Sequence, residues 1–451
     1  MSHPLPPLVA ERIAALRERP VEPVEKGFGP LAGAGLSGAG LSGAGLAAAR
    51  PLLHQAGFTY PLLTLRETAL AGNLAAMAAY CARAGVALAP HGKTAMSPEL
   101  AARQLAHGAW GITVATIGQL RTYRAFGFGR LLLANELVDE AGIAWLAGER
   151  AADPGFGAYC YVDSPEGVAI LDRVLTRYPA GRRLGVLVEI GHAGGRTGCR
   201  TDAQALAVAA AASATGTLRL AGVAGYEGGI GAGTGERGSG QAVQEVAAFC
   251  RRLRTLADTL ADTLGAGHRE DGEEEFIVTA GGSAFFDVVA RELTAGGTNP
   301  VTAVLRSGAY LTHDHGLYRA VSPATRGSAD APVLRPALEL WAQVLSCPEA
   351  GLALRGAGRR DAGSDSGLPV PLRAVRPGGA GLGTGGDLSG SHISELNDQH
   401  AYLRLGRGAV LAPGDLVGLG ISHPCTTFDK WRIIPVVNDE DRVTDLVHAF
   451  F

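Results

Sequence analysis

A lysine occupies the position in this chain where parallel α/β proteins place their chemistry. The apolar run Val86–Ala89 predicts a buried strand, which Pro90 and Gly92 end at once. Lys93 therefore lies at the C-terminal edge of that strand, the edge that carries the catalytic groups of parallel sheets and barrels. Because an amine is desolvated there, we expect Lys93, beside His91, to form a Schiff base with a carbonyl compound or with pyridoxal phosphate. On this stretch alone, the alternative is a loop-edge lysine without a partner.

Two pairs of glycines follow apolar runs further along the chain. They are Gly228 and Gly229, which follow Tyr226, and Gly281 and Gly282, which precede Ser283. Backbone N–H groups at a strand-to-helix turn converge on an anion, and a serine hydroxyl adds a donor. The chain lacks the G-x-x-x-x-G-K-[ST] motif, so the pairs predict a site for a cofactor phosphate and not for a nucleoside triphosphate. Taken singly, each pair is also consistent with a tight turn alone.

Two further polar residues follow the apolar run Leu184–Ile190. We expect His192 to stack on the ring of a bound cofactor and Arg196 to donate to a phenolic oxygen. For Arg196, an ion pair with Glu189 or Glu227 is an equally good interpretation of the spacing.

A candidate metal site lies near the C-terminus, in Ser422-His-Pro-Cys425. His423 and Cys425 place an imidazole and a thiolate on one side of an extended segment. This donor pair suits Zn²⁺ bound in the open manner of catalytic zinc, with the remaining positions left to water or substrate. The alternative is a turn that contains a buried cysteine.

The elements that precede the candidate site residues must position them. Strand and helix patterns alternate from residue 59 to residue 306. The predicted strands are 60–65, 86–89, 111–116, 130–134, 158–162, 184–190, 218–226, 275–280 and 302–306. They are short and apolar enough to be buried on both faces. Their number favours an α/β fold with a parallel (β/α)8 TIM-type barrel over an open sheet.

Beyond Tyr310 the helical periodicity gives way to strand and turn signals. We therefore expect an N-terminal extension at 1–54, a barrel at 55–310 and a second, β-rich domain at 311–451. The predicted strand Tyr60–Leu65 precedes the repeating pattern, and it can also pair with the β-rich domain.

The N-terminal extension contains a repeat of small residues, Gly33–Gly45. It matches G-x-G-x-x-G, the dinucleotide fingerprint. No strand precedes it and no helix-forming run follows, so the pattern favours a flexible loop over a dinucleotide site.

The composition narrows the function classes. A formal charge of −3 over 451 residues, without a basic stripe, argues against nucleic acid as a partner. No apolar run reaches the roughly 18 residues that a membrane span needs, and the N-terminus lacks a signal-peptide pattern. The six cysteines show no C-x-x-C spacing, which suits reduced thiols. We therefore expect a cytoplasmic protein that binds neither nucleic acid nor membrane.

Together the motifs resemble those of the D-serine dehydratase and D-threonine aldolase family, pyridoxal-phosphate enzymes of the alanine-racemase fold. The motifs, in order, are Pro90-His-Gly-Lys-Thr94 with Met96-Ser-Pro98, the Gly191–Gly198 run, Tyr226–Gly229, Gly281–Ser283 and His423-Pro-Cys425. The resemblance covers roughly residues 55–451, and the glycine repeat before it departs from the family pattern.

The resemblance implies a role for each motif. Lys93 would bind the cofactor covalently, Arg196 would contact its phenolic oxygen, and Tyr226 would lie near the pyridine nitrogen. The residues implied around the phosphate are Gly228, Gly229, Gly281, Gly282 and Ser283, and the metal ligands are His423 and Cys425. Family aldolases are expected to carry an aspartate as the second ligand with a harder cation, so Cys425 favours the dehydratase branch and Zn²⁺.

The expected reaction is the dehydration of a β-hydroxy D-amino acid such as D-serine to a 2-oxo acid and ammonia. One alternative is a retro-aldolase that yields glycine and an aldehyde. Others are a non-catalytic pyridoxal-phosphate carrier, which needs no second domain, and a racemase, which needs a second base. A homodimer is expected, because enzymes of this fold usually build the site between two chains.

Overall fold

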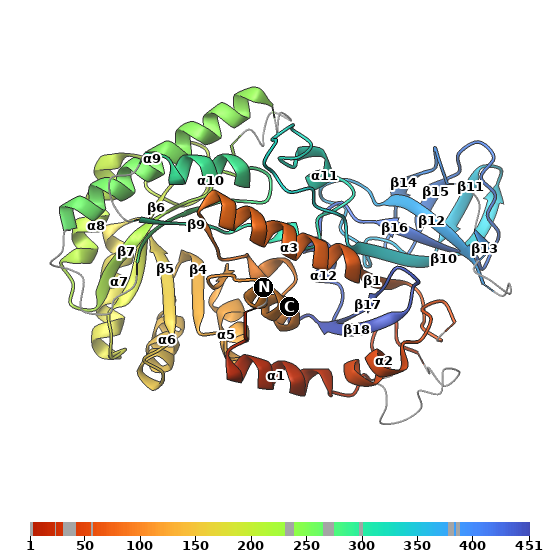
Figure 1. The fold of residues 1–451 in the computed structure, drawn as a ribbon, viewed down its shortest axis with the longest axis horizontal. Coiled ribbons are helices and arrows are strands. Elements are labelled where there is room, and N and C mark those ends of the chain that lie inside the picture. The colour runs from red at the N-terminus through yellow and green to blue at the C-terminus, as the bar shows by residue number, and fades with distance from the viewer. Residues whose placement is uncertain are drawn as a thin grey trace.

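The computed structural model contains two β-sheets that lie side by side, with helices around the first (Figure 1). It describes residues 3–22, 24–29, 42–55, 57–230, 239–264, 275–296, 301–377, 383–384 and 388–451. The two sheets correspond to the barrel and the β-rich domain that the sequence predicts.

The first sheet has eight parallel strands in the order β2-β9-β8-β7-β6-β5-β4-β3. Their bounds are β2 Ala87–Leu88, β3 Ile112–Val114, β4 Arg130–Glu136, β5 Gly157–Val162, β6 Leu184–Ile190, β7 Leu218–Gly225, β8 Phe276–Ala280 and β9 Val301–Leu305. The two ends of the sheet meet just beyond β2, where a parallel bridge joins His91 to Thr113. The Thr113 hydroxyl donates to the Ala89 carbonyl at 2.7 Å. The predicted α/β barrel fold is confirmed.

Helices connect these strands and cover the outside of the sheet (Figure 1). They are α3 Glu67–Ala84, α4 Pro98–Ala106, α5 Ile117–Ala125, α6 Glu140–Ala152, α7 Pro165–Arg177, α8 Asp202–Ser213, α9 Gly240–Leu264 and α10 Phe286–Thr294. Helix α7 shows why they form. The Ser164 side chain caps it by accepting from the Gly167 N–H at 3.2 Å, and Pro165 occupies the first turn. Its buried residues recur every three or four positions and form one apolar stripe: Val168, Leu171, Val174 and Leu175.

The interior of the barrel is filled by side chains that alternate along the strands. The buried members of this cluster are Ala89, Leu132, Tyr159, Tyr161, Leu187, Ala221, Ala224, Ile277 and Val304. Because alternate residues of a strand share a face, the side chains two positions beyond these also point inward. At the C-terminal ends of the strands those positions carry polar groups, and they form the mouth of the barrel.

The second sheet is mixed and runs β13-β12-β16-β10-β1-β17-β18; β11 also pairs with β10, β15 pairs with β11, and β14 pairs with β15. Its strands are β1 Leu62–Arg66, β10 Leu338–Glu349, β11 Leu352–Arg355, β12 Val370–Arg376, β13 Gly383–Thr384, β14 His392–Leu396, β15 Ala401–Arg404, β16 Leu416–Gly420, β17 Ile433–Val437 and β18 Val443–His448. Strand β1 pairs antiparallel with β10 and parallel with β17. The predicted barrel, residues 55–310, includes β1, whereas the observed pairing places β1 in the second sheet. The sequence analysis gave this pairing as the alternative for the strand Tyr60–Leu65.

Among the described residues, four short helical segments interrupt the pattern of strands and long helices. They are η2 Gly92–Thr94, η4 Ala309–Leu311, α11 Leu317–Val321 and α12 Cys425–Phe428. The first and the last of these carry the candidate catalytic and metal-binding residues, so the site forms where the barrel meets the second domain.

The N-terminal residues pack against both domains. Helix α1 Pro7–Arg17 places Val9 in the same apolar cluster as the barrel helices, and α2 Gly43–Ala49 buries Leu46 beside Leu446 of β18. Most of the glycine repeat lies outside the described residues, but its last three residues begin α2. The prediction of a loop is wrong there, because Ser42 caps the helix by accepting from the Gly45 N–H at 3.1 Å.

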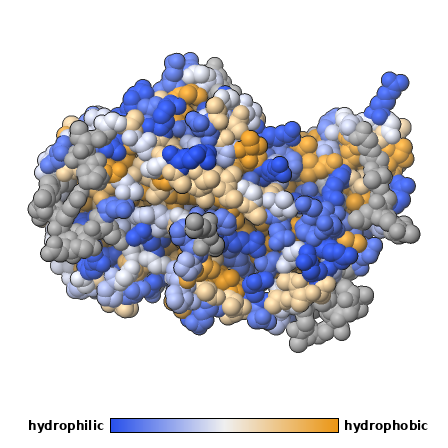
Figure 2. All heavy atoms as spheres, in the orientation of Figure 1, coloured by the Kyte–Doolittle hydropathy of each residue, from blue (hydrophilic) through white to orange (hydrophobic). Residues whose placement is uncertain are grey.

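The surface has no belt of apolar residues in the view of Figure 2, where hydrophilic and hydrophobic residues are interspersed. Among the described residues, every helix is too short or too polar to cross a membrane.

A buried histidine beneath the second sheet makes stability depend on pH. His54 Nδ1 shares a hydrogen bond with the Tyr60 hydroxyl at 3.1 Å, and the ring meets Trp341 edge-on at 4.4 Å. Burial lowers the pKa of His54 to about 4, so the unfolded chain binds more protons than the folded chain between about pH 4 and 6.5. Stability should therefore rise with pH across this window, by up to about 1.4 kcal/mol per pH unit from this group.

Thermal unfolding followed by circular dichroism at several pH values tests this dependence. His54→Gln should flatten the profile, while His107→Gln, which alters an exposed histidine, should leave it unchanged. Parallel profiles for the wild type and His54→Gln would contradict the assignment.

Candidate active site

Lys93 lies in η2, directly after β2, as the sequence predicts. Gly92 is required next to it, since a Cβ there would lie 2.6 Å from the Tyr123 ring. The Tyr123 hydroxyl donates to the Gly92 carbonyl at 2.9 Å and holds the turn. The turn brings the Lys93 amine into the electrostatic range of Cys425 and two arginines from other strand ends.

Lys93 differs from the other lysines of the chain. The sequence contains three lysines, Lys26, Lys93 and Lys430. Lys26 Nζ pairs with Asp361 at 2.6 Å, and Lys430 Nζ pairs with Asp429 at 3.1 Å. Within the described part of the chain, Lys93 has no ion pair. It is therefore the lysine whose amine is available for covalent chemistry.

The surroundings of Lys93 favour its neutral, nucleophilic form. Burial lowers the pKa of its amine, and the positive charges of Arg196 and Arg306 lower it further, against an opposing effect of Cys425. His91 lies two residues earlier, and burial together with Lys93 holds its pKa well below the ordinary value. Its Nδ1 is buried without a hydrogen-bond partner among the described residues.

Arg306 is a site residue that the sequence analysis missed. It follows β9, is 4 % exposed, and donates to the Thr279 hydroxyl at 2.8 Å and the Gly225 carbonyl at 2.6 Å. These bonds fix a guanidinium between the ends of β7, β8 and β9. The rule that identified Lys93, a charged residue at the end of an apolar strand, also identifies Arg306.

Arg196 lies over the ring of Tyr226, with 4.2 Å between its guanidinium carbon and the ring centroid. Neither of the alternative ion pairs, with Glu189 or with Glu227, occurs among the described residues. His192 lies beside Gly229, where an added Cβ would be 3.4 Å from its Nε2. The structure thus brings His192, Arg196 and Tyr226 to one part of the mouth, and their contacts with a cofactor remain predictions.

The glycine pairs behave differently from one another. The Gly281 and Gly282 N–H groups do converge on an anion, but that anion is the carboxylate of Glu227, which is fully buried and accepts from them at 3.0 and 2.6 Å. These two donors are therefore not available to a phosphate in this structure. Glu227 lies within the Tyr226–Gly229 motif, and no local pattern in the sequence links it to Gly281.

The donors left for a cofactor phosphate are the N–H groups of Gly228 and Gly229 and the hydroxyl of Ser283. None of them has a hydrogen-bond partner within the described residues. Together with the amine of Lys93 and the unpartnered Nδ1 of His91, they fit pyridoxal phosphate in chemistry: an amine for its aldehyde and neutral donors for its phosphate.

The candidate metal ligands lie at the start of α12, opposite η2. The Cys425 thiol lies 3.6 Å from the hydroxyl of Thr94, the residue next to Lys93. A hydrogen bond with the Cys425 side chain and another with Asp365 raise the pKa of His423 to about 9. An imidazole and a thiol in mutual contact are a donor set that suits Zn²⁺. The two domains therefore bring the amine and the candidate metal ligands together.

Asp365 orients His423 and was also missed by the sequence analysis. Its Oδ2 lies 2.5 Å from His423 Nδ1, and its Oδ1 accepts from the Thr426 hydroxyl at 2.6 Å. A carboxylate on Nδ1 leaves Nε2 as the metal donor and fixes the ring orientation. Asp365 comes from a glycine- and serine-rich loop far from His423 in the sequence.

Asp365→Asn is therefore expected to weaken zinc binding about 10- to 100-fold. Competition against a chelator of known affinity measures this loss directly. Asp429→Asn, which alters an exposed aspartate near the site, should bind zinc as the wild type does. Equal affinities for Asp365→Asn and the wild type would remove Asp365 from the metal site.

Comparisons with known proteins identify related domains in both parts of the chain. Residues 65–269 match the alanine racemase N-terminal domain, and residues 337–437 match a putative serine dehydratase domain. The chain is 30% identical over 387 residues to a D-threonine aldolase from Arthrobacter sp., covering 84% of this chain and 89% of that protein.

Solved structures share the fold. D-threonine aldolase from Filomicrobium marinum superimposes with a TM-score of 0.71 at 24% identity, covering 87% of this chain and 95% of that one. D-threo-3-hydroxyaspartate dehydratase from Delftia sp. HT23 gives a TM-score of 0.66 at 22% identity, covering 87% and 98%. An alanine racemase-like protein from Idiomarina loihiensis gives 0.65 at 17% identity, covering 87% and 96%.

Proposed function

Since the chain belongs to the D-serine dehydratase and D-threonine aldolase family of the alanine-racemase fold, we propose that it is a zinc-dependent dehydratase of a β-hydroxy D-amino acid such as D-serine. The products would be a 2-oxo acid and ammonia. The observation that supports this reaction is the contact of Cys425 with Thr94, which sets an imidazole–thiol metal site beside the amine of Lys93.

Lys93 is the group that moves the α-proton in this proposal. Pyridoxal phosphate, when bound, supplies an electron sink for the charge that develops at the α-carbon. With its pKa lowered by burial, the Lys93 amine is neutral at a lower pH than an exposed lysine, so it can accept this proton. Arg306, held in place by Thr279, keeps a positive charge in the mouth of the barrel. This charge favours the neutral form of the Lys93 amine before the α-proton is transferred.

His423 and Cys425 are proposed to hold the zinc ion that assists loss of the β-hydroxyl. Zinc, when bound there, supplies a Lewis acid for the leaving oxygen. Asp365 keeps the His423 ring oriented toward Cys425. The enamino acid released after loss of water then takes up water and yields the 2-oxo acid and ammonia.

The retro-aldol reaction is the second candidate, because the Arthrobacter relative is described as a D-threonine aldolase. It would release glycine and an aldehyde from the same class of substrate. The carrier and racemase alternatives are less well supported, since neither has a use for the His423–Cys425 pair.

Product analysis with D-serine, D-threonine and D-threo-3-hydroxyaspartate distinguishes these reactions. The enzyme loaded with pyridoxal phosphate and zinc should release equal amounts of ammonia and 2-oxo acid. Glycine with an aldehyde as the main products would replace the dehydratase with the aldolase. A homodimer is also proposed, and light scattering after size-exclusion chromatography measures its mass.

A further inference from the structure

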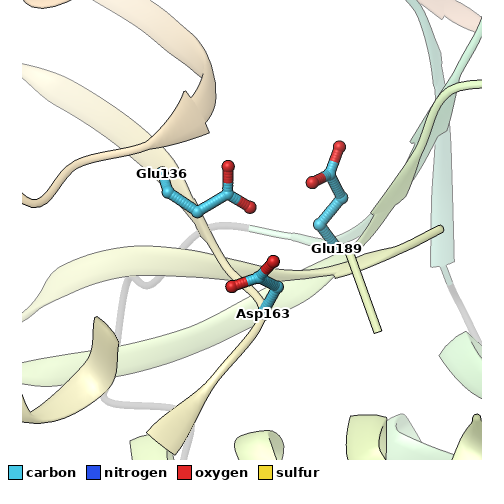
Figure 3. A group of neighbouring side chains, drawn as sticks. All are labelled: Glu136, Asp163 and Glu189. Atoms are coloured by element: carbon cyan, nitrogen blue, oxygen red, sulfur yellow. The ribbon is translucent and has the colours of Figure 1, made fainter. Parts of the chain in front are cut away.

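Three carboxylates meet at the mouth of the barrel, outside the residues assigned above (Figure 3). Glu136 ends β4, Asp163 follows β5 and Glu189 lies near the end of β6. One oxygen from each lies within 4.8 Å of one from both others. The side chains point toward one another from three adjacent strands.

In the part of the chain that the structure describes, no cationic side chain offsets the charge of this cluster. Among the described residues, none of the three carboxylates forms an ion pair with lysine, arginine or histidine. Asp163 accepts from the Gly198 N–H at 3.0 Å, but both oxygens of Glu136 and one of Glu189 are buried without a partner. Burying anionic oxygens without compensation costs several kcal/mol, so the cluster has to bind either a proton or a cation. Burial and the neighbouring Glu189 raise the pKa of Glu136 to about 8, which is the response of a carboxylate that has no cation beside it.

A second observation points to a ligand at the same place. Tyr161 is 2 % exposed, and its hydroxyl has no hydrogen-bond partner in the part of the chain that the structure describes. Tyr161 pairs in register with Glu136, and alternation puts it on the same inward face as Asp163. The charges of Arg306, Glu189 and Glu136 all act on its hydroxyl. The phenol is thus a further unpartnered oxygen on the inward face that carries the cluster.

Nearby arginines do not fill this role. Arg306 lies over the ring of Tyr161, with 5.8 Å to the centroid, but it donates its hydrogen bonds to Thr279 and Gly225. Arg196 lies over the Tyr226 ring instead. Neither arginine forms an ion pair with the three carboxylates among the described residues.

We propose that Glu136, Asp163 and Glu189, with the Tyr161 hydroxyl, bind a hard divalent cation such as Mg²⁺ or Mn²⁺ at the barrel mouth. Oxygen donors alone, three of them anionic, are the ligands that these cations prefer, whereas zinc prefers the nitrogen and sulfur of His423 and Cys425. The two sites thus differ in donor chemistry. The cation would tie together the ends of β4, β5 and β6.

Manganese binding to the full-length enzyme, loaded with pyridoxal phosphate and one equivalent of zinc, tests the proposal. The electron paramagnetic resonance signal of free Mn²⁺ reports its binding during a titration. We expect one saturable Mn²⁺ per chain, displaced by Mg²⁺. Glu136→Gln, Glu189→Gln and Tyr161→Phe should each weaken binding at least tenfold.

Two controls make the outcome decisive. Glu166→Gln, which alters an exposed carboxylate at the start of α7, should bind Mn²⁺ normally. His423→Ala should lose zinc and keep the Mn²⁺ site. Absence of saturable Mn²⁺ binding, the result expected if Glu136 and Glu189 merely share a proton, would overturn the proposal. Binding that persists in all three cluster variants, or disappears in His423→Ala, would overturn it as well.

Discussion

Lys93→Ala is expected to lose covalent attachment of pyridoxal phosphate and to turn over D-serine about 10³- to 10⁴-fold more slowly. The reason is that Lys26 and Lys430 are both held in ion pairs, so neither amine can replace that of Lys93. The visible absorbance of the bound cofactor and the initial rate of ammonia release measure the two effects separately.

Lys430→Ala is the matched control and should retain both the absorbance and the rate. Borohydride reduction followed by peptide mass spectrometry should place the cofactor on the peptide that contains Lys93. A small exogenous amine should restore part of the rate to Lys93→Ala. Cofactor found on Lys26 or Lys430, or an unchanged rate in Lys93→Ala, would refute the role given to this residue.

Removal of zinc is expected to have the second large effect. Chelation, or Cys425→Ala, should lower the rate of dehydration roughly 10²- to 10⁴-fold, because a Lewis acid contributes several kcal/mol to the loss of a poor leaving group. The cofactor should stay bound, since Cys425 and His423 belong to the second domain and Lys93 to the barrel. Zinc content by atomic absorption, cofactor absorbance and the rate are measured on the same sample.

Cys347→Ala is the control for this experiment, because Cys347 is an exposed thiol in β10, outside α12. It should retain zinc and activity. Re-addition of zinc should restore the chelated wild type but not Cys425→Ala at the same concentration. Full activity in a metal-free preparation would exclude zinc from the reaction.

The barrel was predictable because its signals are local. Each strand is a short apolar run ended by a glycine, a proline or a polar residue, and helices such as α7 and α8 begin at the side-chain caps Ser164 and Thr201. The strand-end rule then singled out Lys93 without knowledge of any contact. The strand Leu62–Arg66 was equally clear as an element, but its partners β10 and β17 are distant in the sequence.

The remaining parts of the site depend on contacts that no local pattern encodes. Asp365 meets His423 only because the loop before β12 folds over α12. Glu227 takes the N–H groups of Gly281 and Gly282 because β7 and β8 are neighbours in the barrel. Spacing predicts that glycines end these strands. Whether the glycine N–H groups bind a phosphate or a carboxylate depends on the three-dimensional packing of the barrel.

The place of β1 affects how the protein is made. Its residues Leu62, Leu63 and Leu65 are fully buried between β10 and β17, yet ribosomes synthesise both partner strands only after the whole barrel. The nascent chain must therefore carry an unpaired apolar strand while the barrel emerges. The barrel and the second sheet can therefore be joined through β1 only after β10 has been synthesised, and a translation arrest before β10 would leave β1 exposed to chaperones or to aggregation.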